Sequence, residues 1–407
     1  MRLRFLCGAA GRGLPRLPAA HSLYGRWCSI LIAMRFVCFL FLALCLQAAA
    51  GQTAPTASSA NADELLSRGI AAQQRHDYKT AIEDYRKVLE LRPGLVEARA
   101  NLGAALADAG EFDAAIEEDT RALAASPSKI AVRMNLALAY YKKGDMDHAR
   151  SEFEKVHAAR PADMKTAVLL GYVYIKLNKD ADAVAMLAPL EPGHESDMDF
   201  EYVLGYAMIQ SGKDADGIPR METVARSTLS ADAYVIAGSA RLHRREFHEA
   251  RTDLDKALEL SPSFPGASTM AGQARDALGD TDAALPAFQA ALRQDPNDFT
   301  ANLYLGTMRL KQRDFESARP LLELAVQLQP GASQARLQLA KLNGMTGRYD
   351  EAATTLEDLE RSDPGWLEPH VELAAIYYKL HRPEDGQRER KIVEEIEARQ
   401  QKEGPAK

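Results

Sequence analysis

The chain has 407 residues, of which 46% are hydrophobic and 26% charged, a composition typical of folded proteins but a length that exceeds one ordinary domain core. All four cysteines lie within residues 1–50, which excludes a disulfide or thiolate metal site in the rest of the chain. Residues 51–407 hold 44 basic and 57 acidic side chains, a net charge of −13, which argues against nucleic acid as a partner.

The segment that begins at Met34 has the layout of a secretory signal. Arg35 supplies a short positive region, residues 36–46 form an apolar run, and small residues suited to cleavage follow at 48–50. The sequence therefore predicts a signal peptide over 34–50. Residues 1–33 are either a leader or a mis-assigned start.

Export follows from that signal. We expect a periplasmic or secreted protein, with anchoring to the inner membrane by residues 30–46 as the alternative if the segment is not cleaved. The small polar residues 51–61 predict a flexible linker between the signal and the folded part.

A repeat occupies most of the remaining chain. The dipeptide Leu-Gly recurs in register at Gly103, Gly171, Gly205 and Gly306. Extending this frame in steps of 34, with one step of 33, gives ten units, which start at Ala62, Val96, Ile130, Met164, Met198, Ala231, Pro265, Phe299, Ser333 and Leu367. The eighth and twentieth positions are Gly or Ala in all ten units, and the thirty-second is Pro in seven.

These columns resemble the tetratricopeptide repeat, a helix–turn–helix unit. The resemblance implies an all-α repeat solenoid, a superhelix over residues 62–383, followed by a charged C-terminal cap and tail over 384–407. Small residues at positions 8 and 20 would let the two helices of a unit approach closely. The sequence departs from the family pattern in lacking Trp at position 4 and in placing Asp119 at position 24, where a large apolar residue normally packs.

The fourth and fifth units are irregular. Pro189 should end the second helix of the fourth unit early, and the fifth unit has Gly217 and Pro219 where others have apolar residues. Two interpretations stay open for residues 188–230, ordinary drift of the repeat or a flexible joint.

Motifs of catalysis are absent from the sequence. It contains no phosphate-binding loop, nucleophile elbow or metalloprotease motif, and His243 and His248 are expected to be solvated residues around a turn. We therefore expect no enzyme, no cofactor, no metal and no small-molecule substrate.

The family resemblance also implies a binding surface. Its members line an inner groove with positions 2, 5, 9, 12 and 13 of the first helices, and Asn at position 6 often holds the backbone of a ligand. On this chain the implied partner-binding residues are Asn101, Met134, Asn135, Leu138, Tyr141, Lys142, Val168, Tyr172, Ile175, Lys176, Tyr202, Tyr206 and Ile209. The pair Tyr140–Tyr141 should divide its roles, the first residue packing in the fold and the second facing the groove.

The expected function is that of a non-catalytic scaffold which binds a peptide or helix of a partner protein in this concave groove. A periplasmic assembly or secretion chaperone and an accessory subunit of an envelope enzyme complex are the alternatives.

Overall fold

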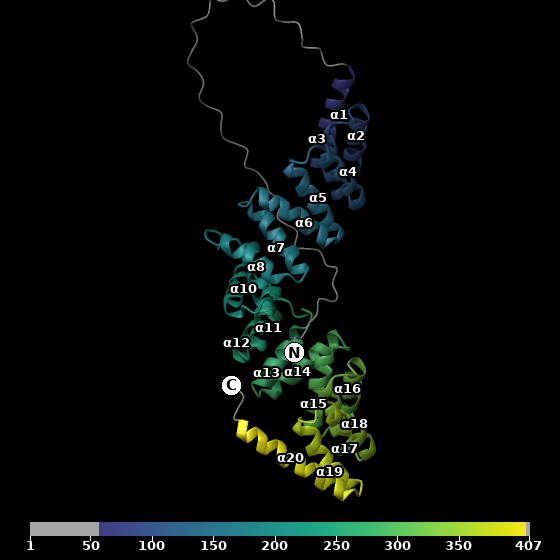
Figure 1. The fold of residues 1–407 in the computed structure, drawn as a ribbon, viewed down its shortest axis with the longest axis vertical. Helices are drawn as coiled ribbons and strands as arrows, with labels where there is room; N and C mark the ends of the chain where they lie inside the picture. The colour runs from purple at the N-terminus through teal and green to yellow at the C-terminus, as the bar shows by residue number, and fades with distance from the viewer. Residues whose placement is uncertain (1–56, 404–407) are drawn as a thin grey trace, which may run out of the picture. The chain divides into compact units, whose positions relative to one another are not determined.

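The computed structural model describes residues 57–403, and side chains from residue 61 to 401. Within that range the chain forms twenty α-helices, one short 3-10 helix and no strand (Figure 1). The first helices of the units are α1 (Ala57–Gln74), α3 (Val96–Asp108), α5 (Ile130–Lys143), α7 (Met164–Lys176), α9 (Met198–Gln210), α11 (Ala231–His243), α13 (Ala267–Ala277), α15 (Phe299–Lys311), α17 (Ser333–Met345) and α19 (Leu367–Lys379).

The second helices are α2 (Tyr78–Leu91), α4 (Phe112–Ala125), α6 (Met146–Ala159), α8 (Asp180–Leu187), α10 (Asp214–Thr228), α12 (Phe247–Leu260), α14 (Thr281–Gln294), α16 (Phe315–Leu328), α18 (Tyr349–Ser362) and α20 (Pro383–Glu403). Each helix packs on the next one in the chain, and neighbouring first helices, such as α7 and α9, also pack directly. The chain is thus an all-α helix–turn–helix repeat solenoid. No helix between residues 57 and 403 is both long and apolar enough to cross a membrane.

Helix boundaries differ from the sequence frame at both ends of the array. Helix α1 begins at Ala57, five residues before the first unit and inside the predicted linker 51–61. Ala and Ser at this point extend the helix backwards, because neither opposes helix formation strongly. Helix α20 runs through residue 384 without a break, so the cap is the continuation of the second helix of the last unit. The predicted leader and signal peptide lie outside the described residues.

Close contact between the two helices of a unit explains the small residues at position 8. A Cβ atom added to Gly272 would lie 2.7 Å from the ring of Phe288, and one added to Gly171 would lie 2.7 Å from a methyl group of Leu187. Phe288 and Leu187 occupy position 24 of their units and are fully buried. A large residue at 24 therefore requires a small one at 8.

Every unit reverses direction at position 15, where the backbone is left-handed. Gly occupies this position in five units, with φ between 77° and 88°. The other five units place His76, Asn178, Arg245, Arg313 and His381 there, with φ between 55° and 63°. A side chain with a Cβ costs about 1–2 kcal/mol in this conformation, so the arginine and histidine turns are strained relative to the glycine turns.

Relief of that strain is a testable prediction for Arg313, which lies in the turn after the first helix of the eighth unit with φ 60°. We expect Arg313→Gly to raise the free energy of unfolding by about 0.5–1 kcal/mol, because Gly adopts this conformation without the steric cost. Urea unfolding followed by circular dichroism measures the change. Gly347→Ala at the equivalent turn should lower stability instead, and a loss in both variants would contradict the argument.

The irregular fourth and fifth units keep their packing. Helix α8 ends at Leu187 and Pro189 lies in the following 3-10 helix, which confirms the early stop. In the next unit, a Cβ atom added to Gly217 would lie 2.7 Å from the carbonyl oxygen of Gly205. Gly217 thus brings α10 unusually close to α9. The flexible joint over 188–230 stays a hypothesis.

In the second and third units an arginine forms a polar clamp at position 4, where the family pattern has Trp. In the second unit Arg99 donates to Glu118 at position 23 over 2.6 Å and to the carbonyl of Pro93 over 3.0 Å. Arg133 makes the same pair of contacts in the third unit, at 2.6 and 3.1 Å. Each clamp joins the first helix of a unit to its second helix and to the loop that precedes it.

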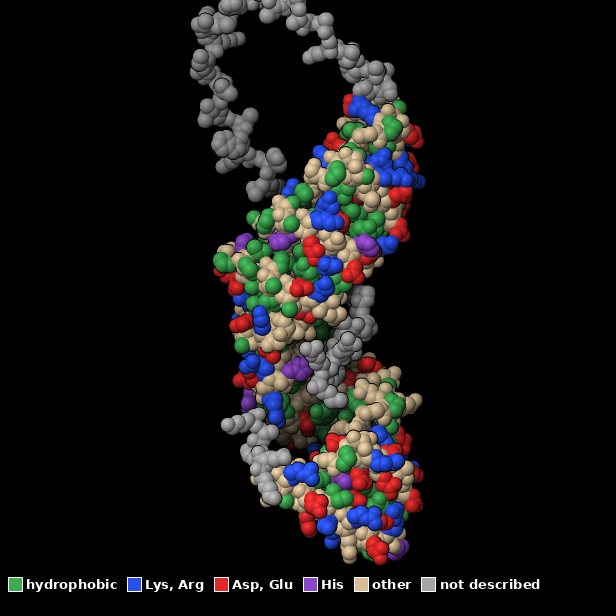
Figure 2. All heavy atoms as spheres, viewed as in Figure 1, with side chains coloured by type: hydrophobic (Ala, Val, Ile, Leu, Met, Phe, Trp, Pro, Cys, Tyr) green, Lys and Arg blue, Asp and Glu red, His purple; other side chains and the backbone are tan. Residues whose placement is uncertain are grey.

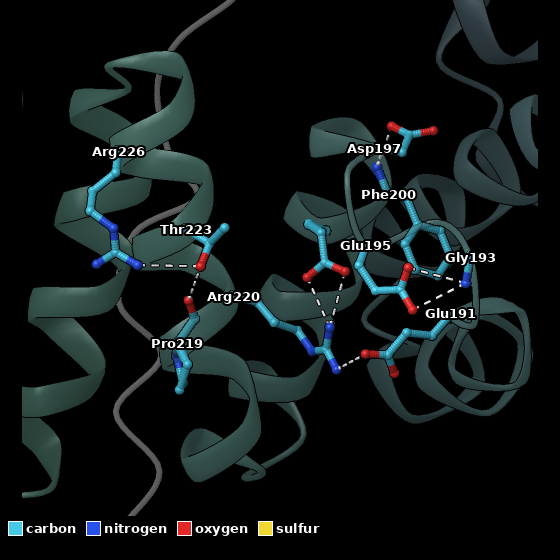
Figure 3. A network of polar contacts seen from close by, with 10 residues as sticks. Glu191, Gly193, Glu195, Asp197, Phe200, Pro219, Arg220, Thr223 and Arg226 are labelled. Atoms are coloured by element: carbon cyan, nitrogen blue, oxygen red, sulfur yellow. Dashed lines mark hydrogen bonds and ion pairs between the residues drawn. The ribbon is translucent and has the colours of Figure 1, made fainter.

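The fifth unit contains a clamp of reversed polarity (Figure 3). Glu201 occupies position 4, and Arg220 at position 23 donates to it over 2.8 Å. The same guanidinium also pairs with Glu191, in the loop before α9. Only 4% of the Glu201 side chain and 19% of the Arg220 side chain are exposed. Arg220 therefore neutralises two carboxylates and joins three segments.

Candidate partner-binding surface

Four tyrosines on consecutive first helices form the principal candidate site. Tyr141 lies on α5, Tyr172 on α7, and Tyr202 and Tyr206 on α9; we call them the tyrosine stripe. All four side chains are half-buried. Tyr141, Tyr202 and Tyr206 rest on the hydrophobic clusters of their own and neighbouring units, so the fold positions the rings and still leaves part of each one accessible.

Direct ring contacts connect members of the stripe across and within units. The centroids of Tyr141 and Tyr172 lie 6.0 Å apart with their planes at 75°, an edge-to-face contact between two units. Tyr202 and Tyr206 are stacked, at 6.4 Å and 12°. The ammonium of Lys176 lies 5.0 Å from the centroid of Tyr172. Both ring arrangements are those that aromatic pairs prefer.

Burial keeps the hydroxyl groups of Tyr141 and Tyr202 protonated at physiological pH, because it raises the pKa of both. Burial raises the pKa of Tyr141 to about 12. Burial, and then the neighbouring Asp232 carboxylate, also raise the pKa of Tyr202, whose hydroxyl donates to Asp232. The hydroxyls of Tyr141 and Tyr172 make no hydrogen bond to another described residue. These two are therefore available to a ligand.

The structure places the other predicted residues beside the stripe or on its N-terminal side. Met134 and Leu138 pack on the cluster around Phe153, and Val168 and Ile175 pack on the cluster shared by α7 and α9. The half-buried set is Asn101, Met134, Asn135, Leu138, Val168, Ile175 and Ile209; Lys142 and Lys176 are exposed. Figure 2 shows acidic and basic side chains interspersed over the visible face, with hydrophobic ones gathered around α7 and α8.

Two asparagines extend this surface toward the N-terminus. Asn101 and Asn135 hold position 6 of consecutive units, and neither carboxamide hydrogen-bonds to another described residue. Asn101 also lines an open hollow of about 420 Å³ together with Glu97 and Tyr85. Lys142 is engaged already, 3.3 Å from Asp108 on α3.

The division of roles between Tyr140 and Tyr141 is less sharp than the sequence predicts. Tyr140 packs on the core and stacks on His148 with ring centroids 4.9 Å apart. Tyr141 packs on the same cluster around Phe153 and is also half-buried. Tyr141 therefore also contributes to packing, because the edges of the first helices overlap the core of the next unit. That its ring faces a binding groove stays a prediction.

Asp232 is the residue of this surface that the sequence interpretation missed. It lies on α11 in the sixth unit and accepts the hydrogen bond of Tyr202 from the neighbouring unit. Its position 2 belongs to the set that lines the groove in the family, so extending the residue-by-residue comparison by one unit would have included it.

The paired helices stack into a helical repeat array, and three consecutive first helices of it, α5, α7 and α9, carry the tyrosine stripe. Sequence models described as tetratricopeptide repeat match residues 66–130, 269–333, 309–375 and 130–163. The chain belongs to the tetratricopeptide repeat family. Arrays of this family typically act as non-catalytic scaffolds that bind proteins or peptides.

The chain also resembles several solved structures, with which it shares little sequence. MamA is 25% identical over 41% of this chain and 92% of its own, with a TM-score of 0.38. YrrB, described as a TPR protein with an unusual peptide-binding site, is 24% identical over 43% of this chain and 90% of its own, with a TM-score of 0.39. The C-terminal part of a repeat protein from Cytophaga hutchinsonii is 19% identical over 59% and 99%, with a TM-score of 0.48. No curated protein matches the chain.

Proposed function

We propose that this chain is an exported, non-catalytic scaffold that binds a segment of a partner protein across the tyrosine stripe. The observation that carries the proposal is the stripe on three consecutive first helices. The rings on α5 and α9 pack on the core, Tyr172 on α7 meets Tyr141 edge to face, and all four rings remain partly accessible. Tyr is among the residues that contribute most binding energy at protein interfaces, because a rigid ring buries large area and its hydroxyl still forms a hydrogen bond.

The spacing of the repeat suits an extended segment. Packed helices lie about 8–10 Å apart, and an extended chain advances about 3.3 Å per residue, so three residues of ligand span one unit. A peptide crossing the stripe would meet one tyrosine-bearing helix every third residue. The unengaged carboxamides of Asn101 and Asn135 each offer a donor and an acceptor, the pair that a peptide backbone requires.

Two other functions would use the same surface. A chaperone would bind many peptides quickly and weakly, whereas a scaffold would co-purify with one stable partner. An accessory subunit of an envelope enzyme complex would bind a catalytic protein and bring no activity of its own. The peptide-binding site named for YrrB is a precedent within the same fold.

Export of the chain rests on the segment from Met34 to residue 50, with its positive start, apolar run and small residues. We propose a periplasmic or secreted location, with an uncleaved anchor over residues 30–46 as the alternative. Edman sequencing of the protein from its native envelope decides between them, since a new N-terminus near Gly51 requires cleavage.

The test of the binding surface is the double substitution Tyr172→Ala with Tyr206→Ala. Affinity purification and mass spectrometry first identify the partner, and its dissociation constant is then measured for each variant. We expect the double variant to weaken binding by about 30-fold or more, because each lost ring costs about 1–3 kcal/mol at an interface. Helicity by circular dichroism should be unchanged.

Matched variants separate binding from folding. Tyr172→Phe with Tyr206→Phe keeps both rings and should retain most of the affinity. Tyr304→Ala removes a half-buried tyrosine that stacks on Phe288 in another part of the array, and should leave binding intact. A double alanine variant that still binds with the original affinity would place the partner elsewhere.

A further inference from the structure

A second polar site lies at the C-terminal end of the array, away from the tyrosine stripe. Glu360 on α18, His370 on α19 and Glu389 on α20 bring one imidazole nitrogen and two carboxylate oxygens within 4.8 Å of one another. The side chains of His370 and Glu389 are 1% and 5% exposed, and Glu360 is half-buried. Three different helices thus converge on one small, mostly buried cluster.

The hydrogen bonds of His370 define what the cluster can hold. Its Nε2 lies 3.2 Å from the carbonyl oxygen of Pro364, and a carbonyl only accepts, so Nε2 carries a hydrogen. In the neutral ring Nδ1 then carries a lone pair and can only accept, yet it lies 2.7 Å from a carboxylate oxygen of Glu389. Two acceptors face each other at that distance only if a proton or another cation lies between them.

The last unit has a histidine at position 4, where the second and third units have an arginine. Position 4 is Arg99 in the second unit, where the guanidinium satisfies both Glu118 and the carbonyl of Pro93. His370 occupies the same position and faces the equivalent partners, Glu389 and a proline carbonyl. An arginine cannot ligate a metal ion, whereas a neutral imidazole is the commonest metal ligand among side chains.

The second carboxylate, that of Glu360, completes the set. Glu360 corresponds in the repeat to Glu191, which in the fifth unit pairs with Arg220. In the last unit no arginine stands at position 23, and Glu389 is there instead. The cluster therefore has an excess of anionic ligands over cations.

We propose that Glu360, His370 and Glu389 form a zinc-binding site. One imidazole and two carboxylates, with water as the fourth ligand, are a ligand set that Zn²⁺ accepts, and the bond from Nε2 to a backbone carbonyl is the usual support of a ligating histidine. Tetrahedral coordination places ligand atoms about 3.3 Å apart, which small side-chain rotations reach from the present separations. The half-buried Glu360 gives the ion a route of entry.

Zinc at this place would join α18, α19 and α20. The terminal unit of a repeat array packs on one neighbour only and frays more easily than the interior units. A metal bond across three helices would hold that end, a structural role independent of partner binding on the stripe.

The test is zinc binding by the full-length chain, with the metal alone as the probe. Purified protein at pH 7.5 is titrated with Zn²⁺ in competition with a chromophoric chelator, and Co²⁺ is used in parallel for its absorption spectrum. We expect one ion bound in the wild type that is absent in His370→Arg. That variant keeps the clamp, as Arg99 does, and removes the ligand. A tetrahedral Co²⁺ spectrum should disappear with it.

Glu360→Gln supplies the second control, because Glu360 makes no hydrogen bond that the clamp needs. We expect it to weaken zinc at least tenfold while leaving the melting temperature of the metal-free protein unchanged. Equal zinc binding by the wild type and His370→Arg would overturn the proposal, as would a wild type that binds no zinc at 100-fold molar excess. Circular dichroism confirms that each variant is folded.

Discussion

Asp119→Leu is expected to stabilise the array, by about 5 kcal/mol at pH 7.5. Asp119 is fully buried in α4, and neither carboxylate oxygen has a hydrogen-bond partner. Burial raises its pKa to about 8, with a smaller contribution from Glu118. In the unfolded chain the carboxyl group would have a pKa of about 3.9. Folding at neutral pH must therefore either protonate this group or bury its unpaired charge. Each pH unit between the unfolded and the folded pKa lowers the free energy of unfolding by about 1.4 kcal/mol.

Leucine fits the same space. It has the same number and branching of side-chain heavy atoms as aspartate, and Leu187 already occupies position 24 against Gly171 in the fourth unit. In the second unit the Asp119 carboxylate lies directly over Gly103 in the same way. Replacement of an unpaired buried acid by a matching apolar group removes its desolvation cost and leaves no cavity.

The pH dependence identifies the cause. A carboxyl group whose pKa is higher in the folded state destabilises the fold progressively from about pH 4 to about pH 8 and by a constant amount above that. The advantage of Asp119→Leu, measured from chemical unfolding at several pH values, should therefore grow over this range. Asp119→Asn should remove the pH dependence but stabilise less, because its amide stays unpaired. A wild type as stable as Asp119→Leu at pH 7.5 would show that the acid has a partner in solution.

Sequence periodicity predicted the fold because packing depends on a few columns that every unit repeats. The first helix of the third unit begins at Ile130 and that of the ninth at Ser333, both at the frame position. The early end of α8 followed from Pro189 alone. The sequence also showed that Asp119 departs from the family pattern. It could not show that the side chain is completely buried, because a rotation of α4 that exposed position 24 to solvent would also have accounted for an aspartate there.

The polar clamps could not be predicted because they depend on side-chain conformations across units. Arg220 satisfies two carboxylates that are 19 and 29 residues away, and nothing in the column pattern distinguishes it from a solvated arginine. The hydrogen bond from Tyr202 to Asp232 also joins two units and could not be predicted from the column pattern. The residues of the stripe could be predicted only from the family resemblance. Their partial burial results from packing between units, which the sequence does not show.

Arg220→Ala is expected to lower the free energy of unfolding by about 3–5 kcal/mol. The substitution leaves Glu201 buried and Glu191 partly buried without a cation (Figure 3), and an uncompensated buried charge is far more costly than the intact pair is stabilising. Arg226→Ala on the same helix is the matched control. Arg226 is mostly exposed and lies 3.7 Å from Glu222, a surface pair that contributes no more than about 1 kcal/mol.

A double-mutant cycle tests the mechanism of that loss. If the unpaired Glu201 carboxylate is the cause, Arg220→Ala with Glu201→Ala should be more stable than Arg220→Ala alone, since the second substitution removes the charge that the first one strands. Urea unfolding of the four proteins measures the coupling. A double variant that simply adds the two single losses would instead mean that Arg220 stabilises the fold by packing its side-chain stem against Gly205. The two residues are close, since a Cβ atom added to Gly205 would lie 3.0 Å from the Cβ atom of Arg220.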